Sequence, residues 1–269
     1  MLPNIQNQIS DEKLITEAIS GNKKSLETLV KRYQDYIYNI SLKLFLNPDD
    51  ALDATQEVLI KVVTRLKTFK GESKFQTWLY RIAVNHFLNA SESKTEKFFI
   101  NKPSDSDAIE ENSLKASEEE IEEVRLLCST AMLMCLNREQ RLIYIIGEIF
   151  RADHNLGADL FGTTTANYRV KLHRAKSDLL NFVSGKCGII NPENPCRCPK
   201  KANSMIAEGI VNKDKMIFNL KFQHKIKDIV KIQKDTISDN LQLKMVNLFQ
   251  NSPFQIKEEL NIMFEKLLK

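Results

Sequence analysis

Between about residues 10 and 95, apolar side chains recur every three or four positions, which is the spacing of one face of an α-helix. The pattern runs through Leu26, Leu29, Val30, Tyr33, Ile37, Ile40 and Leu44. Glycine and proline are scarce, with 8 and 7 in 269 residues, whereas Leu, Ile, Lys and Glu are plentiful. Because this balance favours helices over sheets, we expect an all-α protein.

Two turn signals divide this first stretch. The segment "NPDD" at 47–50 joins a turn to acidic residues at a helix start, where the helix dipole favours negative charge. A helix is expected from there to about Leu66, and "KTFKGESK" then interrupts the pattern at Gly71. A further helix is expected over "FQTWLYRIAVNHFLNA", with its core face formed by Phe75, Leu79, Ile82 and Ala83.

The remaining chain divides by composition. Residues 98–123 are acidic, contain Ser and Pro, and are poor in large apolar side chains, which is typical of a solvated linker. Residues 124–185 are helical in pattern again, and 186–269 hold a cysteine-containing element followed by a basic helical extension. We therefore expect a first helical module at 10–97, the linker, a second module, and the extension.

The second module has the pattern of a helix-turn-helix. A short helix is expected to end at Gly162, which can take the left-handed conformation, and Thr163 or Thr164 can cap the next helix. That helix, over 164–176, places one apolar face opposite a polar one. The apolar face is Tyr168, Leu172 and Ala175, and the polar face includes Asn167, Val170 and Arg174.

The net charge of +4 permits nucleic-acid binding but does not argue for it, because the clustering of basic residues on one surface matters more than the total charge. No membrane-length apolar run and no signal-peptide pattern occur, so a cytoplasmic protein without a membrane partner is expected. The sequence also lacks a phosphate-binding glycine loop, a nucleophile elbow and a His–carboxylate metal motif. These absences argue against an enzyme.

Three of the five cysteines crowd together, at Cys187, Cys196 and Cys198, between stiffening prolines. Three thiolates with one further ligand would suit zinc, and His154, His173 or water are candidates for the fourth position. Redox-responsive thiols and reduced packing cysteines are the alternatives, and the sequence does not decide among them. Zinc is therefore an open cofactor assignment.

The segment "NPDDALDATQEVLIKVVTRLKTFKGESKFQTWLYRIAVNHFLN" resembles the second conserved region of RNA polymerase sigma factors of the extracytoplasmic-function class. The resemblance is carried, in the family's order, by the acidic helix start, "DATQEV" at 53–58 and "FKGESKFQTWLYRIAVN" at 69–85. It implies a transcription initiation factor that binds core RNA polymerase and directs it to promoter DNA. An anti-sigma factor is a further candidate partner.

The expected polymerase-binding residues share one helix face, because they are spaced three or four apart. They are Asp53, Gln56, Glu57 and Ile60. Two carboxylates, an amide and an apolar side chain suit a basic partner helix, and the resemblance implies the clamp of the beta-prime subunit. Read without the resemblance, the same residues are an ordinary exposed helix face.

The next helix carries a second stripe beside its core face, made of Trp78, Arg81, Asn85 and Asn89. Rings, guanidinium and amides suit unstacked bases, which stack on aromatics and hydrogen-bond through their edges. The resemblance implies reading and melting of the minus-ten element here, with Lys74 beside it. A core position is the alternative for Trp78 and Phe69.

The helix-turn-helix resembles the family's fourth region, which binds the minus-thirty-five element in the major groove. Its DNA-binding candidates are Thr164, Asn167, Arg169, Lys171 and Arg174. Asn167 and Arg174 are expected at base edges, and Arg169 and Lys171 at phosphates.

The approach to this helix departs from the family pattern. Asp153 stands where a serine usually caps, Asn155 replaces a glutamate, and Gly157 replaces an alanine that packs helix on helix. Gly157 is expected to cost about 0.5–1 kcal/mol of helix stability relative to alanine. The departure leaves room for an alternative: a helix-turn-helix regulator that works without polymerase, for which the first module would have no use. A sigma factor whose cysteine tail responds to metal or redox state is the other alternative.

Overall fold

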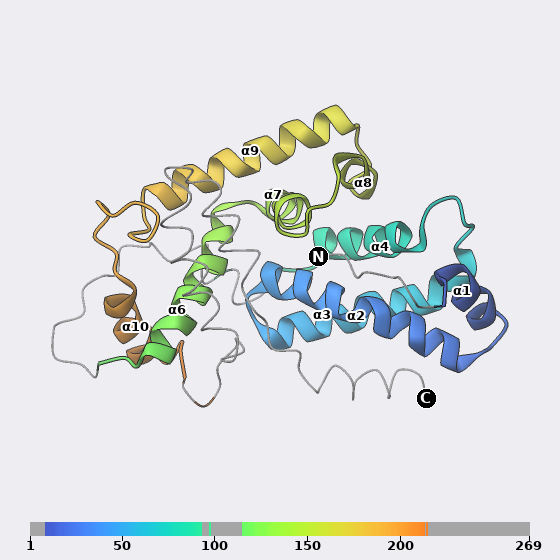
Figure 1. Ribbon diagram of the computed structural model, residues 1–269, viewed down its shortest axis with the longest axis horizontal. Helices are drawn as coiled ribbons and strands as arrows, with labels where there is room; N and C mark the ends of the chain where they lie inside the picture. Colours follow the sequence, from blue (N-terminus) through green and yellow to red (C-terminus); the bar gives the residue numbers. More distant parts are fainter. Residues whose placement is uncertain (1–8, 93–96, 98–114, 213, 215–269) are drawn as a thin grey trace. The chain divides into compact units, whose positions relative to one another are not determined.

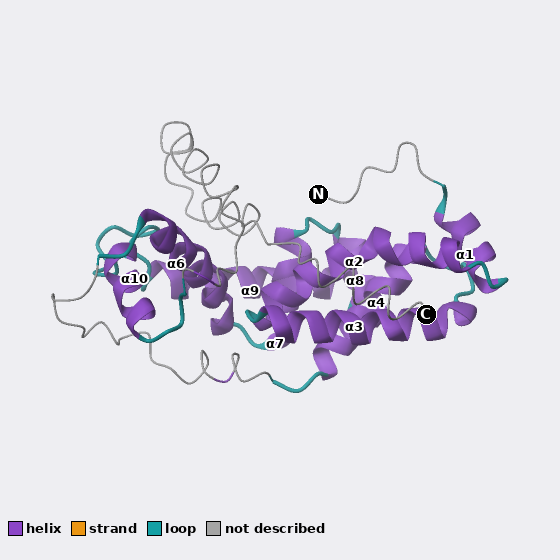
Figure 2. Ribbon diagram, turned by 90° about the horizontal axis from the view of Figure 1, so that it is seen from below, coloured by secondary structure: helices purple, strands orange, loops and turns teal. Residues whose placement is uncertain are grey.

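The computed structural model describes residues 9–92, 97, 115–212 and 214. These residues form helices and connecting loops, with no strand among them (Figure 2). The all-α prediction is confirmed. The linker residues 98–114 and the extension beyond 214 lie outside the described residues. None of the helices within the described ranges is both long and apolar enough to cross a membrane.

The chain divides into two compact units, and the division differs from the predicted modules. Among the described residues, the first unit holds 9–92 and 138–173, and the second holds 115–137 and 174–212. The predicted second module is divided between the units, because its residues 138–173 belong to the first unit and its residues 124–137 and 174–185 to the second. Helix α9, Thr165–Ser184, is continuous across the second of these boundaries (Figure 1).

In the first unit, α1 (Asp11–Ile19), α2 (Lys23–Phe45), α3 (Pro48–Arg65) and α4 (Phe75–Asn89) form one bundle (Figure 1). Side-chain oxygens of Ser10, Asn22 and Asn47 accept hydrogen bonds from backbone amides at the starts of α1, α2 and α3. These caps satisfy amides that have no partner inside the helix. The predicted helix start at "NPDD" is confirmed.

The core of this bundle is the predicted apolar face. Its members on α2 and the facing helices are less than a tenth exposed: Leu29, Val30, Tyr33, Ile37, Ile40, Leu44, Val58, Leu59, Leu79, Ala83 and Phe87. Ile82, predicted in the same core face, is instead half-buried. Tyr33 also donates its hydroxyl to the Asp11 carboxylate, which joins α1 to α2.

Two arginines of α7 (Arg138–Tyr144) attach this helix to the ends of bundle helices. Arg141 is fully buried and donates to the Leu44 carbonyl, 2.9 Å away, near the end of α2. Arg138 donates to the carbonyls of Ala90 and Ser91, just after α4. Because the last carbonyls of a helix have no intrahelical donor, these guanidinium groups supply it.

The helix-turn-helix is formed by α8 (His154–Leu160) and the start of α9. Asp153 accepts from the amides of Asn155 and Leu156, as predicted for its capping role. Gly162 has a φ of +58°, and Thr164 Oγ1 accepts from the Asn167 amide at 3.2 Å. Both turn predictions are confirmed.

The second unit packs α6 (Glu118–Ala131) against α10 (Cys198–Ala207). The last part of the predicted solvated linker is wrong, because 118–123 begin α6. Ile121 is 9% exposed, and the carboxylate-bearing Glu122 and Glu123 are 1% and 2% exposed. An acidic helix start is favoured by the dipole, and the apolar Ile121 gives the segment a face to bury.

Gly157 has a packing role that could not be predicted from its low helix propensity. A Cβ atom there would lie 2.2 Å from Cζ of Tyr168, a ring that is completely buried. Only a residue without a side chain allows α8 to approach this ring.

We predict that Gly157→Ala destabilises the protein, although alanine is the better helix former. Overpacking typically costs about 1–3 kcal/mol, which exceeds the gain of about 0.5–1 kcal/mol in helix propensity. Thermal unfolding should show a lower Tm. The double variant Gly157→Ala/Tyr168→Leu should lose less than the sum of the single variants, and simple additivity would contradict the clash.

Candidate nucleic-acid interface

A groove of about 840 Å³ lies between α3 and α4 in the first unit. Its lining residues come from both helices and from the segment after α4: Phe45, Asp50, Asp53, Ala54, Glu57, Lys61, Arg65, Trp78, Arg81, Ile82, Asn85, His86, Asn89, Ala90, Ser91 and Glu92. The groove therefore collects members of both predicted stripes, which the sequence placed on separate helices.

The α3 wall presents two of the four predicted polymerase-binding residues, because Gln56 and Ile60 lie outside the groove lining. Asp53 and Glu57 are exposed and line the groove, while Gln56 is half-buried. Ile60 is 41% exposed, which is unusual for an isoleucine, and lies outside the lining. The opposite face of α3 buries Ala51, Val58 and related apolar residues, so the stripe is fixed outward by the core.

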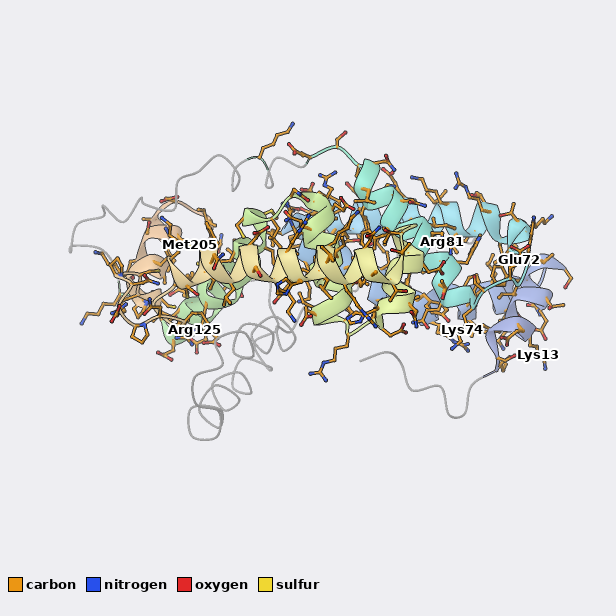
Figure 3. The ribbon with its side chains drawn as sticks, turned by 90° about the horizontal axis from the view of Figure 1, so that it is seen from above. Lys13, Glu72, Lys74, Arg81, Arg125 and Met205 are labelled. Atoms are coloured by element: carbon orange, nitrogen blue, oxygen red, sulfur yellow. The ribbon has the colours of Figure 1, made fainter. Side chains whose placement is uncertain are left out.

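The α4 wall presents the predicted minus-ten residues Trp78, Arg81, Asn85 and Asn89. Asn85 and Asn89 are exposed, and Trp78 and Arg81 are half-buried. Lys74 is exposed just before α4, outside the groove lining, and is labelled with Arg81 in Figure 3.

The Trp78 ring is held by aromatic neighbours. Its centroid lies 5.5 Å from that of Phe69 and 5.6 Å from that of Phe75. Phe75 is 4% exposed, so the contact anchors one edge of Trp78 in the core. Both interpretations of Trp78 thus describe part of its position, since it packs on the core and also borders the groove.

Arg81 forms an ion pair with Asp159 of α8. The two side chains are 42% and 46% exposed. An exposed pair of this kind contributes about 0–1 kcal/mol, so Arg81 can exchange Asp159 for another anion at little cost.

The groove also holds a Lys–His–Glu arrangement that the sequence reasoning missed. Lys61 Nζ lies 2.6 Å from His86 Nδ1, and His86 Nε2 lies 3.8 Å from Glu57 Oε2. The ammonium group of Lys61 can only donate hydrogen bonds. His86 Nδ1 is therefore the acceptor, and the imidazole is neutral. Burial and then the charge of Lys61 lower the pKa of His86, and Glu57 opposes them.

The one sequence signal for this arrangement was the spacing of four residues between Glu57 and Lys61, because it puts both side chains on one helix face. Its meaning depended on His86 from a second helix, which spacing along one helix cannot reveal.

The recognition-helix candidates lie on the exposed side of α9. Thr164, Asn167, Arg169 and Arg174 are exposed, and Lys171 is half-buried. Tyr168, Leu172 and Ala175 are at most 5% exposed, which confirms the predicted two faces. Arg169 Nε contacts His154 Nδ1 at 3.0 Å, and Lys171 pairs with Glu139 at 2.6 Å.

The cysteines Cys187, Cys196 and Cys198 all lie in the second unit, where Cys187 is buried and the other two are half-buried. None of the five cysteines forms a disulfide bond. Within the described residues, no group of three or more His, Cys, Asp or Glu side chains is already arranged to hold a metal ion. The predicted zinc site stays a prediction.

Replacing Lys61 by Met should raise the pKa of His86 toward its ordinary value, because one of the charges that lower it is removed. Burial would still keep it below that value. In the wild type, neutral His86 contributes to the free energy of unfolding at pH values above the pKa that this histidine has in the unfolded chain. The contribution is lost as the pH falls through the lower pKa of His86 in the folded protein. NMR titration of the His86 ring measures the shift, with Lys67→Met as control; an unchanged His86 titration in Lys61→Met would contradict the contact.

Comparison with known proteins agrees with this site. The family model described as Sigma-70 region 2 matches residues 29–96, which include both walls of the groove. The ECF RNA polymerase sigma-E factor of Haemophilus influenzae is 40% identical over 82 residues, covering 30% of this chain and 43% of that protein.

Other relatives match to a similar extent. The RNA polymerase sigma-H factor of Pseudomonas aeruginosa is 33% identical over 105 residues, or 39% of this chain and 52% of that protein. The sigma-E factor of Escherichia coli K12 is 36% identical over 85 residues, or 32% and 44%. The chain thus spans about half the length of the curated relatives it matches.

Among solved structures, CnrH in complex with the cytosolic domain of CnrY is 19% identical and covers 65% of this chain and 97% of that one. The TM-score is 0.48. The sequence matches show that residues 29–96 of this chain carry a sigma-70 region 2 domain, and that this part of the chain is similar to sigma factors of the extracytoplasmic-function class.

Proposed function

We propose that this protein is a transcription initiation factor that binds core RNA polymerase and directs it to promoters. The observation that carries the proposal is the groove between α3 and α4, which lies within the matched sigma-70 region 2 domain. The α3 wall carries the carboxylates of Asp50, Asp53 and Glu57, followed by Lys61 and Arg65. The α4 wall combines an aromatic ring, a guanidinium group and amides. Such a pair of surfaces suits a basic protein helix on one side and unstacked bases on the other.

Polymerase binding is assigned to the outward face of α3. Asp53 and Glu57 offer carboxylates, Gln56 an amide, and Ile60 an apolar contact in the same stripe. This mixture gives a basic partner helix both charge complementarity and an apolar contact. The partner proposed is the clamp of the polymerase beta-prime subunit.

Minus-ten recognition is assigned to α4 and to Lys74 before it. Trp78 offers a half-buried aromatic ring for stacking, and the exposed amides of Asn85 and Asn89 can hydrogen-bond base edges. Arg81 can leave Asp159 for a phosphate, since their exposed pair is weak. These contacts hold unpaired bases and so favour melting.

Minus-thirty-five recognition is assigned to the first half of α9. Asn167 and Arg174 are exposed and suited to base edges, and Arg169 and Lys171 to phosphates. Thr164 lies exposed at the helix start, where backbone amides also favour a phosphate. Val170 is 49% exposed on this side and offers an apolar contact to a thymine methyl group.

The region 2 match favours this proposal over a helix-turn-helix regulator that works without polymerase. Such a regulator has no need of a carboxylate-bearing groove wall facing a base-binding wall. An anti-sigma partner remains a prediction.

Replacing both Asp53 and Gln56 by Ala should weaken binding to core RNA polymerase about tenfold, or about 1.4 kcal/mol, because a charge and an amide are lost from the α3 stripe. A fluorescence-anisotropy titration with purified core enzyme measures the Kd. Glu27→Ala is the matched control, since it removes an exposed carboxylate from α2. Equal affinity of the double variant and the control would contradict the docking assignment.

Asn85→Ala should reduce open-complex formation while leaving core binding within about twofold, because the amide faces bases and not the polymerase-binding stripe. Permanganate reactivity of thymines in the melted region reports the open complex. Asn181→Ala removes a comparable exposed amide from α9 and serves as the control. Wild-type reactivity in Asn85→Ala would remove this residue from the base-binding wall.

A further inference from the structure

All five cysteines belong to the second unit, and four of them lie on α6, on α10 or in the loop between α9 and α10. Cys128 on α6 and Cys198 at the start of α10 pack against one apolar cluster, formed by Ile121, Val124, Leu127, Ala202, Met205 and Val211. Cys128 Sγ lies 3.9 Å from Met205 Sδ, which comes from α10. Met205 on α10 and Arg125 on α6 are labelled in Figure 3. Two thiols from helices far apart in sequence therefore share one core.

The loop between α9 and α10 folds back on itself and brings in the other two cysteines. Asn194 donates its amide to the carbonyls of Ser184 and Cys187, at 2.8 and 3.2 Å. Gly188 touches the backbone at Cys196 so closely that a Cβ atom would lie 2.1 Å from the Cys196 carbonyl oxygen. The residue after Cys187 is thus packed onto Cys196.

A guanidinium group closes the same loop from its other end. Arg197 donates to the carbonyls of Cys196 and Pro192, at 2.9 and 3.1 Å. These bonds fix the chain on both sides of Cys196 and immediately before Cys198. These hydrogen bonds place the residue after Cys187 against the backbone of Cys196, two positions before Cys198.

The electrostatics agree that the four thiols are neighbours. The pKa of the Cys128 thiol is raised to about 12, mainly by burial and to a smaller extent by Cys198, Cys196 and Cys187, while Lys201 opposes the rise. The pKa of Cys198 is raised by burial, against a hydrogen bond and a positive charge from Arg125. Cys135, by contrast, is exposed.

We propose that Cys128, Cys187, Cys196 and Cys198 together bind one thiophilic metal ion of the zinc class. The sequence suggested three of these ligands and left His154, His173 or water for the fourth position. The structure places Cys128 beside Cys198, whereas both histidines belong to the first unit. Four thiolates satisfy the tetrahedral preference of zinc without a further ligand.

The ion has to draw the thiols together, because within the described residues none of the candidate groups already has a coordinating arrangement. Zinc–sulfur bonds are about 2.3 Å long, so the proposal requires the cysteine side chains to turn toward a shared point. Four thiols lose four protons as four zinc–sulfur bonds form, so the site carries a net charge of −2. Arg125 and Lys201 supply nearby positive charge.

The same features weigh against a redox sensor. Oxidation requires access to the thiol, and Cys187 is buried while Cys128, Cys196 and Cys198 are half-buried. A metal ion bound by these thiols deprotonates them as it binds. Metal binding is therefore the chemistry that this set of thiols favours.

The test uses the full-length protein and Co(II) or Zn(II) as probes. Wild type should bind one equivalent of Co(II), with the thiolate charge-transfer and visible bands of a tetrahedral four-sulfur site, and zinc should displace it. Cys128→Ser should lower zinc affinity about tenfold or more. Cys135→Ser should bind as wild type does, and it is the matched control.

A second measurement avoids any variant that fails to fold. In wild type, zinc should protect four thiols from alkylation, as read by mass spectrometry, while Cys135 reacts with and without the metal. Protection of fewer than four thiols, a cobalt spectrum without four-sulfur character, or absence of metal binding would each overturn the proposal. None of these readouts requires polymerase or DNA, so they are independent of the proposed function.

Discussion

The close packing of α2 against α3 fixes the side chains that the α3 wall presents to the groove. At their contact the side chains are small, with Ser41, Ala51 and Thr55 all fully buried. Thr55 donates to the Ala51 carbonyl at 2.6 Å and lies 3.2 Å from the Ser41 hydroxyl, so both hydroxyls stay satisfied in an apolar core. Because the inner face of α3 is fixed in this way, its outer face must carry Asp53 and Glu57 toward the groove.

The second wall depends on aromatic packing between helices. Phe87 of α4 meets Phe45 at the end of α2, with ring centroids 6.1 Å apart. At the other end of α4, Phe69 and Phe75 hold Trp78. Both ends of α4 are therefore anchored by rings, and the amides between them lie on a rigid helix. A site on rigid helices keeps its geometry when a ligand arrives.

Local sequence signals predicted a large part of this structure. The turn at 47–50, the capping role of Asp153, the left-handed Gly162 and the two faces of α9 follow from capping and periodicity. Each depends on residues within a few positions of one another, which is the range over which helix rules act. The stripes on α3 and α4 were predicted for the same reason.

Features that depend on contacts between distant segments could not be predicted. Spacing along one helix does not show that Lys61 meets His86, or that Cys128 lies near Cys198. The buried start of α6 was predicted as linker because acidic composition outweighed one apolar residue, Ile121. Composition describes the average of a segment, whereas burial depends on the partner that covers it.

Gly157 and Tyr168 are packed so closely that the Tyr168 ring occupies the space beside the Gly157 backbone. The space that an alanine methyl group would fill on α8 is occupied from α9 by a tyrosine ring. The residue at 157 therefore cannot be judged by itself, and neither can the residue at 168. Among relatives that keep this packing, an alanine at the first position implies a smaller side chain at the second, and the two should vary together.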